Sequence, residues 1–191
     1  MREQPAEDPK NTALAVVLLQ IRDAVDIGRP FDAEYQALVA LAQGHPHIAA
    51  AAAPLAEPAR SGVASRATLI ERLRQLAPQI ATARPPPKAT WKSQMVARLR
   101  SLVTIRRIDE GSEQSPAEAA VGKAQHDMAA GDLAGAVAAL DGLTGANQAA
   151  AEPWLKMAKQ RLAVESALRQ VAAALTASLG SAAPTVAGKG G

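Results

Sequence analysis

The feature that most constrains this fold is a glycine–aspartate step followed, about twenty residues later, by a proline–tryptophan step. The two steps lie in the segments Gly131-Asp132-Leu133-Ala134-Gly135-Ala136-Val137 and Pro153-Trp154-Leu155. Glycine can adopt the left-handed conformation that ends one helix, and the aspartate side chain can cap the next. Upstream, Ser115-Pro116-Ala117-Glu118 matches a capping box with proline at the first helical position. We therefore predict a helix over residues 116–130 that turns back at once into a second helix.

The C-terminal module predicted over residues 115–179 contains this hairpin and a third helix, each with one apolar side. Gly145 is expected to end the second helix and Pro153 to start the third. The expected packing residues are Leu140, Leu143, Trp154, Leu155, Leu162 and Leu168. The basic residues expected to face away from the apolar side are Lys156, Lys159, Arg161 and Arg169. Because three alanine-rich helices cannot cover so many leucines, we expect the module to dock on a second copy or on the helix at residues 12–25.

Alanine dominates the apolar residues of the chain. Hydrophobic residues make up 48% of its 191 residues, yet there are only two Trp, one Tyr and one Phe. Alanine is the strongest helix former, and runs of β-branched residues are missing, so the composition favours closely packed helices with a thin core. The absence of cysteine excludes disulfides, thiolate catalysis and cysteine-ligated metal sites. The predicted fold class is all-α.

The N-terminal region, residues 12–83, is predicted to form four helices arranged as α-solenoid-like hairpins. Apolar residues recur there at helical spacing, and Gly28 and Gly62 stand 34 residues apart at equivalent turns. The polar start, residues 1–11, and the Gly, Ala and Pro tail, residues 180–191, are expected to be disordered.

A proline-rich linker and a basic amphipathic helix are predicted over residues 84–109, opening with Pro85-Pro86-Pro87. Nine of the 21 Lys and Arg residues lie between Arg72 and Ile108, where there is no acid, and the other twelve stand against 18 acidic residues. Such an asymmetry predicts a localised anionic partner. An apolar arc with a tryptophan at one end and basic side chains at its borders is typical of an interfacial helix. The expected lipid-binding residues are Lys88, Trp91, Lys92, Met95, Arg98, Leu99, Arg100, Leu102, Arg106 and Arg107.

Other interpretations of the sequence are weaker. The helix within residues 84–109 has the alternative of packing on neighbouring helices with a solvated arginine face. His45-Pro46-His47 lacks a third metal ligand, so no metal or cofactor is predicted. His126 and Asp127 point about 100° apart on a helix and have no nucleophile near them, which indicates an exposed face. With one aromatic residue in the basic segment and an acidic remainder, nucleic-acid binding is not expected.

The order of three short motifs resembles the C-terminal domain of the mitofilin family, in particular its alphaproteobacterial branch. They read Ala-Gly-Asp-Leu-Ala-x-Ala-Val, Leu-x-x-Leu-x-Gly and Pro-Trp-Leu-x-x-Ala-x-x-Arg-Leu, starting at Ala130, Leu140 and Pro153. Upstream, the segments that follow the same family order are 27–31, 62–66 and 102–107. The resemblance covers roughly residues 12–178.

This resemblance implies a non-enzymatic inner-membrane protein whose soluble part faces the periplasm. Such proteins shape membrane curvature and contact sites by lipid binding and self-association. The implied partners are anionic lipids, further copies of the chain, and an outer-membrane or other envelope protein. Alternatives from other classes are a tetratricopeptide-like adaptor that binds a protein in a groove, and a purely structural oligomerisation module.

Family members are similar in having an N-terminal transmembrane helix followed by a coiled coil, and this sequence shows neither. Its longest clean apolar run, Ala13 to Leu19, is far too short to span a bilayer. We therefore expect the chain to be the membrane-distal part of such a protein, as a fragment, a split gene or a late start.

Overall fold

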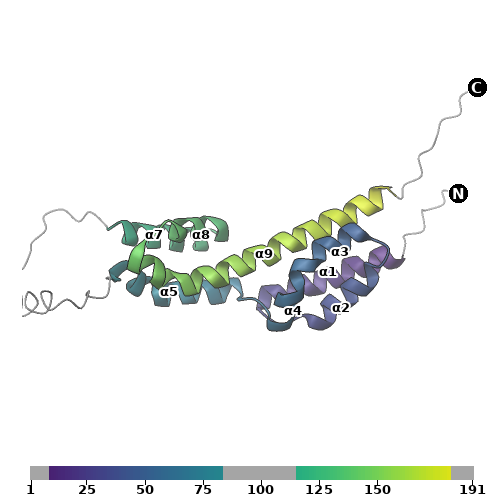
Figure 1. The fold of residues 1–191 in the computed structure, drawn as a ribbon, viewed down its shortest axis with the longest axis horizontal. Helices are drawn as coiled ribbons and strands as arrows, with labels where there is room; N and C mark the ends of the chain where they lie inside the picture. Colours follow the sequence, from purple (N-terminus) through teal and green to yellow (C-terminus); the bar gives the residue numbers. More distant parts are fainter. Residues whose placement is uncertain (1–8, 84–114, 182–191) are drawn as a thin grey trace, which may run out of the picture. The chain divides into compact units, whose positions relative to one another are not determined.

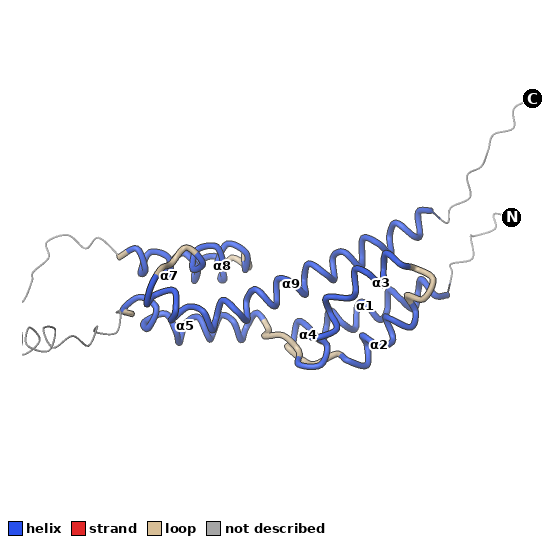
Figure 2. Tube along the Cα trace, in the orientation of Figure 1, coloured by secondary structure: helices blue, strands red, loops and turns tan. Residues whose placement is uncertain are grey.

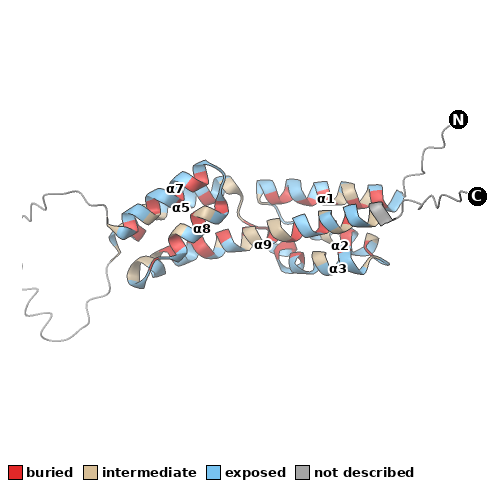
Figure 3. Ribbon diagram, turned by 90° about the horizontal axis from the view of Figure 1, so that it is seen from above, coloured by how far each residue is buried: buried red, intermediate tan, exposed pale blue. Residues whose placement is uncertain are grey.

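The computed structural model describes residues 9–83 and 115–181, and in these ranges every regular element is a helix (Figure 1, Figure 2). The prediction of an all-α fold is confirmed, whereas the α-solenoid-like arrangement stays a prediction. Buried positions recur at intervals along each helix between exposed ones (Figure 3). This is the amphipathic pattern that the apolar spacing predicts.

The helices form two compact units, whose boundaries fall inside α5 (Arg66–Thr82) and α9 (Gly145–Ser181). The first unit joins Met1–Thr68 with Met157–Gly191, and the second is Leu69–Lys156. The 37-residue α9 contributes one part to each unit. The predicted domain boundaries stay predictions.

The first unit combines the C-terminal part of α9 with helices from the N-terminal region. These are α1 (Pro9–Ile27), α2 (Asp32–Leu41), α3 (Pro46–Ala52), the short 3₁₀ helix η1 (Ala53–Leu55) and α4 (Ala56–Ser61). The predicted apolar face of α1 is buried, and Leu168, Val171 and Leu175 of α9 belong to the same buried cluster as Leu14 and Leu18. The apolar side of α9, which was expected to dock on a second copy or on the helix at residues 12–25, therefore packs within the chain against that helix and its neighbours.

Three predicted helix boundaries were wrong. α1 begins at Pro9 instead of residue 12, and Gly145 begins α9 instead of ending the second helix, which ends at Asp141. The short α4 contains a proline, Pro58. Pro58 lies in the first turn of α4, where a backbone N–H has no partner within the helix. The third error concerns Pro153, which lies inside α9 instead of starting it. Ala149 and Pro153 are both exposed, so water can satisfy the carbonyl that lacks an N–H partner, and the alanines around them favour continued helix.

Gly28 and Gly62, which the sequence placed at equivalent turns, lie against each other in the first unit. Both have positive φ, 80° and 71° respectively. A Cβ at Gly62 would lie 3.2 Å from the Gly28 carbonyl oxygen and 3.1 Å from the Pro30 nitrogen. The turn is completed by Arg29, which donates to Glu34 Oε1 at 2.7 Å and thereby holds the pKa of that carboxyl below its usual value. Glycine is needed at these positions for its conformation and for space.

Replacing Gly62 with alanine is expected to lower the free energy of unfolding by about 2 kcal/mol, because strain at positive φ is combined with backbone crowding. Gly44→Ala is the matched control: its φ is +91°, and nothing lies within 4 Å of the added Cβ. This control isolates the strain of positive φ, about 1 kcal/mol. Urea unfolding followed by circular dichroism measures both variants. Equal losses at the two positions would show that the turn-to-turn contact has no energetic importance.

The second unit contains α7 (Pro116–Ala129), α8 (Leu133–Asp141), most of α5 and the first part of α9. The predicted capping box is confirmed: the Glu118 N–H donates to Ser115 Oγ at 3.2 Å, and the Ser115 N–H donates to Glu118 Oε2 at 2.9 Å. The predicted turn is confirmed as well, since Gly131 has φ 82° and Asp132 Oδ1 accepts the Gly135 N–H at 2.8 Å. Local hydrogen bonds thus determine the hairpin of α7 and α8.

Trp154 is the largest fully buried side chain of the described residues, with 0% exposure. Its Nε1–H donates to the carbonyl oxygen of Leu69 on α5 at 2.8 Å. Two helical turns before it, Asn147 of α9 donates from Nδ2 to the Ile80 carbonyl oxygen at 2.6 Å. The start of α9 is therefore attached to α5 by two side-chain hydrogen bonds as well as by apolar contact.

Candidate functional site

The predicted lipid-binding residues lie outside the described residues. They are Lys88, Trp91, Lys92, Met95, Arg98, Leu99, Arg100, Leu102, Arg106 and Arg107. Their assignment to a membrane-binding helix therefore stays a prediction.

The predicted packing residues are distributed over both units. Leu140, Leu143, Trp154 and Leu155 are buried in the second unit, and Leu168 is buried in the first. Leu162 is half-buried. Of these six side chains, none is a fully exposed apolar contact for a second copy, so their presence alone does not require an oligomer.

The most elaborate polar arrangement in the described residues is centred on Arg161 of α9, in the first unit. Its side chain is 1% exposed, although the sequence placed it away from the apolar side. Nη1 donates to the carbonyl oxygens of Val25 and Ala64 at 2.8 and 3.2 Å. Nη2 donates to Asp26 Oδ1, and Nε donates to Glu165 Oε1, both at 2.9 Å. These bonds occupy four of the five N–H donors of a guanidinium, which makes burial of the charge tolerable.

Two carboxylates neutralise this buried charge from different helices. Glu165, one helical turn after Arg161, also accepts two hydrogen bonds from Nη2 of Arg66, each 3.1 Å long. Asp26 is 74% exposed and lies near the C-terminus of α1. That helix end carries partial negative charge, so a cation beside it is favourable. The network thus connects α1, the loop before α5, the first residue of α5, and α9.

The burial of Arg161 was missed because basic residues usually lie on solvated helix faces. A signal was nevertheless present in the sequence. Glu165 falls on the apolar side of the predicted helix and stands four residues after Arg161, the spacing of an ion pair. An acid on an apolar face requires a partner, and that partner was one turn away.

A shallow hollow next to the network opens on the surface of the first unit. It has a volume of about 270 Å³, and the basic residues on its wall are Arg22, Arg66 and Arg169. Asp26 and Glu165 provide the acids, and Leu168 provides apolar surface. Arg22 and Arg169 have neither a hydrogen bond nor an ion pair with any residue in the described ranges.

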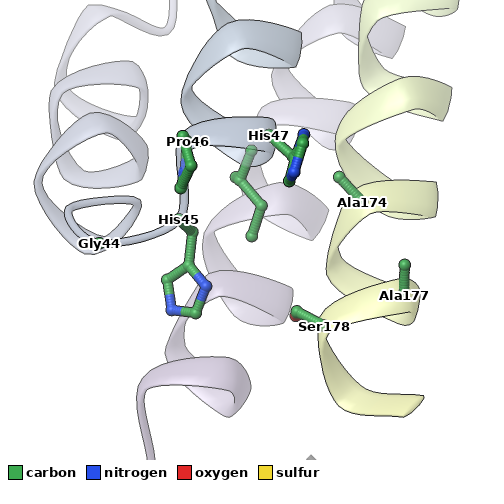
Figure 4. Close-up of a pocket in the computed structure, with 8 residues that line it drawn as sticks. Gly44, His45, Pro46, His47, Ala174, Ala177 and Ser178 are labelled. Atoms are coloured by element: carbon green, nitrogen blue, oxygen red, sulfur yellow. The ribbon is translucent and has the colours of Figure 1, made fainter. Parts of the chain in front are cut away.

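The two histidines that the sequence raised as metal ligands border a second hollow, of about 360 Å³. His45 and His47 lie on the two sides of Pro46, opposite Ala174, Ala177 and Ser178 of α9 (Figure 4). Within residues 9–83 and 115–181, no three His, Cys, Asp or Glu side chains come together in a group suited to a metal ion. This hollow therefore has no built set of metal ligands.

One further expectation was wrong: Asp127 does not lie on an exposed face. It is 8% exposed, and Lys123 donates to its Oδ2 at 2.9 Å. Its carbonyl oxygen accepts the Asp132 N–H at 2.8 Å. Asp127 thus supports the turn between α7 and α8 and belongs to the structure of the hairpin.

Fold and site together define a helical packing protein, in which buried polar side chains such as Arg161 and Trp154 connect helices within the described residues. The family model named Mitofilin, described as a mitochondrial inner membrane protein, matches residues 6–176. The chain therefore belongs to the mitofilin family, as its motifs indicated. No described helix combines the length and the apolar character that a membrane crossing requires.

The chain is similar to the probable magnetosome protein Mms36 of Magnetospirillum gryphiswaldense. It is 34% identical to this chain over 155 residues, which is 81% of the chain and 44% of the relative. The chain thus spans less than half the length of that relative. No solved structure matches the chain.

Proposed function

We propose that this chain is a non-enzymatic organiser of the inner membrane, which binds anionic lipid through residues Lys88–Arg107 and acts as an assembly of copies. The observation that carries the proposal is the charge distribution: a basic segment without acids precedes the helical module, in a chain that is otherwise acidic. Membership of a family described as an inner membrane protein supports it. A periplasmic location and an outer-membrane or other envelope protein partner belong to the same proposal.

The expected strength of lipid binding follows from charge and apolar area. Six cations between Lys88 and Arg107 each contribute up to about 1 kcal/mol at an anionic surface, and less as salt is added. Insertion of Trp91 and its apolar neighbours adds about 25 cal/mol per Å² buried. Ordering the segment costs part of this gain. The result is reversible binding, which becomes effective at a membrane only when several copies act together.

Replacing Arg98 and Arg100 by glutamate is expected to abolish co-sedimentation with anionic liposomes. The reversal changes the local charge by four units at the centre of the segment and places acids next to anionic lipid. Wild-type binding should decrease with salt, and Trp91→Ala should weaken it through lost apolar insertion. The far-ultraviolet circular dichroism of each variant should match that of the wild type, which separates lost binding from lost folding.

The matched control for this experiment is the Arg72→Glu, Arg74→Glu double variant. It reverses two arginines at the same spacing on α5, where both are exposed and Arg74 makes only a surface ion pair with Glu71. Binding should survive in this control. If Arg98→Glu, Arg100→Glu binds lipid as wild type does, the segment is not the lipid-binding element and the proposal fails.

Self-association is expected to use exposed apolar residues of α1, since the module's own leucines are largely covered. Val16, Leu19 and Ile27 are 49%, 62% and 65% exposed, and their spacing places them on one side of the helix. Leu19→Glu should therefore shift the chain to a monomer, whereas Gln36→Glu, at an exposed position of α2 away from this face, should not. Sedimentation velocity over a concentration series measures both. A wild-type chain that stays monomeric up to high micromolar concentration would rule out the homo-oligomer.

A further inference from the structure

The hollow beside the Arg161 network has an excess of positive charge. Arg161 and Arg66 are balanced by Asp26 and Glu165, through the ion pairs described above. Arg22 and Arg169 remain on the wall of the hollow, and neither bonds to a described residue. The arrangement therefore carries a net charge of +2. The excess charge lies on Arg22 of α1 and Arg169 of α9.

The interior side of the hollow is held rigidly. Arg66 is fixed by two hydrogen bonds to Glu165, whose carboxylate is fixed in turn by the buried Arg161. The carboxylates of Asp26 and Glu165 already form ion pairs with guanidinium groups, so they attract a further cation only weakly. A ligand entering this site meets a wall fixed by these bonds, whereas the exposed Arg22 and Arg169 supply the N–H donors that remain free to bind it.

We propose that this hollow binds a phosphate monoester, either soluble or as the headgroup of a lipid. A monoester carries about −1.5 to −2 charges at neutral pH, which balances the two unpaired arginines, whereas a carboxylate or phosphodiester carries only one. Guanidinium groups bind phosphate oxygens through paired hydrogen bonds. The volume of the hollow is about 270 Å³. Because one water molecule occupies ~30 Å³ in the liquid, this volume is large enough for a phosphate group and the carbons nearest to it. Leu168 provides apolar surface for those carbons.

The direct test is calorimetric titration of the whole chain with glycerol 3-phosphate at low salt. We expect saturable binding that weakens at least tenfold in the Arg22→Gln, Arg169→Gln variant. The matched control is Arg72→Gln, Arg74→Gln, which removes two exposed arginines outside the hollow and should bind as wild type does. Absence of saturable binding to either source, soluble ester or lipid, overturns the proposal. So does equal weakening in the control, because it would indicate general electrostatic attraction.

A second arm distinguishes the two sources of the monoester. Phosphatidylcholine vesicles containing phosphatidic acid, whose headgroup is a phosphate monoester, are floated with the chain in an Arg98→Glu, Arg100→Glu background. Binding that is lost on adding Arg22→Gln and Arg169→Gln identifies the lipid headgroup as a ligand. Binding of glycerol 3-phosphate alone identifies a soluble ester. The background also separates this site from the proposed function, since the charge reversal at Arg98 and Arg100 should leave the glycerol 3-phosphate titration unchanged.

Discussion

Arg161→Ala is expected to lower the free energy of unfolding by about 3–5 kcal/mol, the usual loss when one member of a buried ion pair is removed. The substitution leaves Glu165, which is 16% exposed, without its closest cation on α9. It also removes the side chain that satisfies the carbonyl oxygens of Val25 and Ala64. Three segments far apart in the sequence thereby lose their common contact.

Urea unfolding followed by circular dichroism measures this loss, with Arg169→Ala as the control. Arg169 lies two helical turns further along α9 and is exposed, so its replacement should change stability by less than about 0.5 kcal/mol. Arg161→Met adds a useful comparison, because it keeps the aliphatic volume but removes the charge. A small loss for Arg161→Ala, equal to that of Arg169→Ala, would show that the network does not stabilise the first unit.

Trp154→Ala is expected to be similarly destabilising, by about 3–5 kcal/mol, through the cavity left in the second unit. The indole is fully buried, and the surrounding alanine-rich helices have few large side chains with which to fill the space. Trp154→Phe separates the two contributions of this residue. Phenylalanine retains most of the apolar contact but cannot donate to the Leu69 carbonyl oxygen, so its loss should be about 1–2 kcal/mol.

Thermal and urea unfolding of the two Trp154 variants, followed by circular dichroism, measure these losses. If Trp154→Phe is as damaging as Trp154→Ala, the hydrogen bond to α5 carries more of the stability than the apolar contact. If Trp154→Ala is nearly neutral, the second unit does not depend on this side chain and its assignment as the central packing residue is wrong.

Features that depend on interactions between residues close together in the sequence were predicted correctly. The capping box at Ser115 and Glu118 spans three residues, and so does the bond from Asp132 to Gly135. The start of α7, the turn at Gly131 and the apolar face of α1 could therefore be predicted from nearby residues. Pro153 shows the limit of such rules, because a proline can be accommodated inside a helix when its neighbours favour helix and the freed carbonyl is exposed.

The candidate sites divide in the same way. The basic segment could be recognised from the sequence because charge composition needs no tertiary contact. The hollow with its arginines could not, since Arg22, Arg66 and Arg169 are widely separated in the chain and are brought together only by folding. The Gly28 and Gly62 turns were visible as glycines, but their mutual contact was not.

By itself, the sequence determined the all-α class, the hairpin of α7 and α8, and membership of the mitofilin family, because each depends on composition, local hydrogen bonds or motif order. Only the tertiary structure decided that the two ends of α9 belong to different units, and that Arg161 is buried. The physical reason is distance along the chain: the partners of Arg161 on α1 and in the loop before α5 are 97 to 136 residues away. A charge becomes a core residue only when such distant groups provide its hydrogen bonds, and no local pattern specifies them.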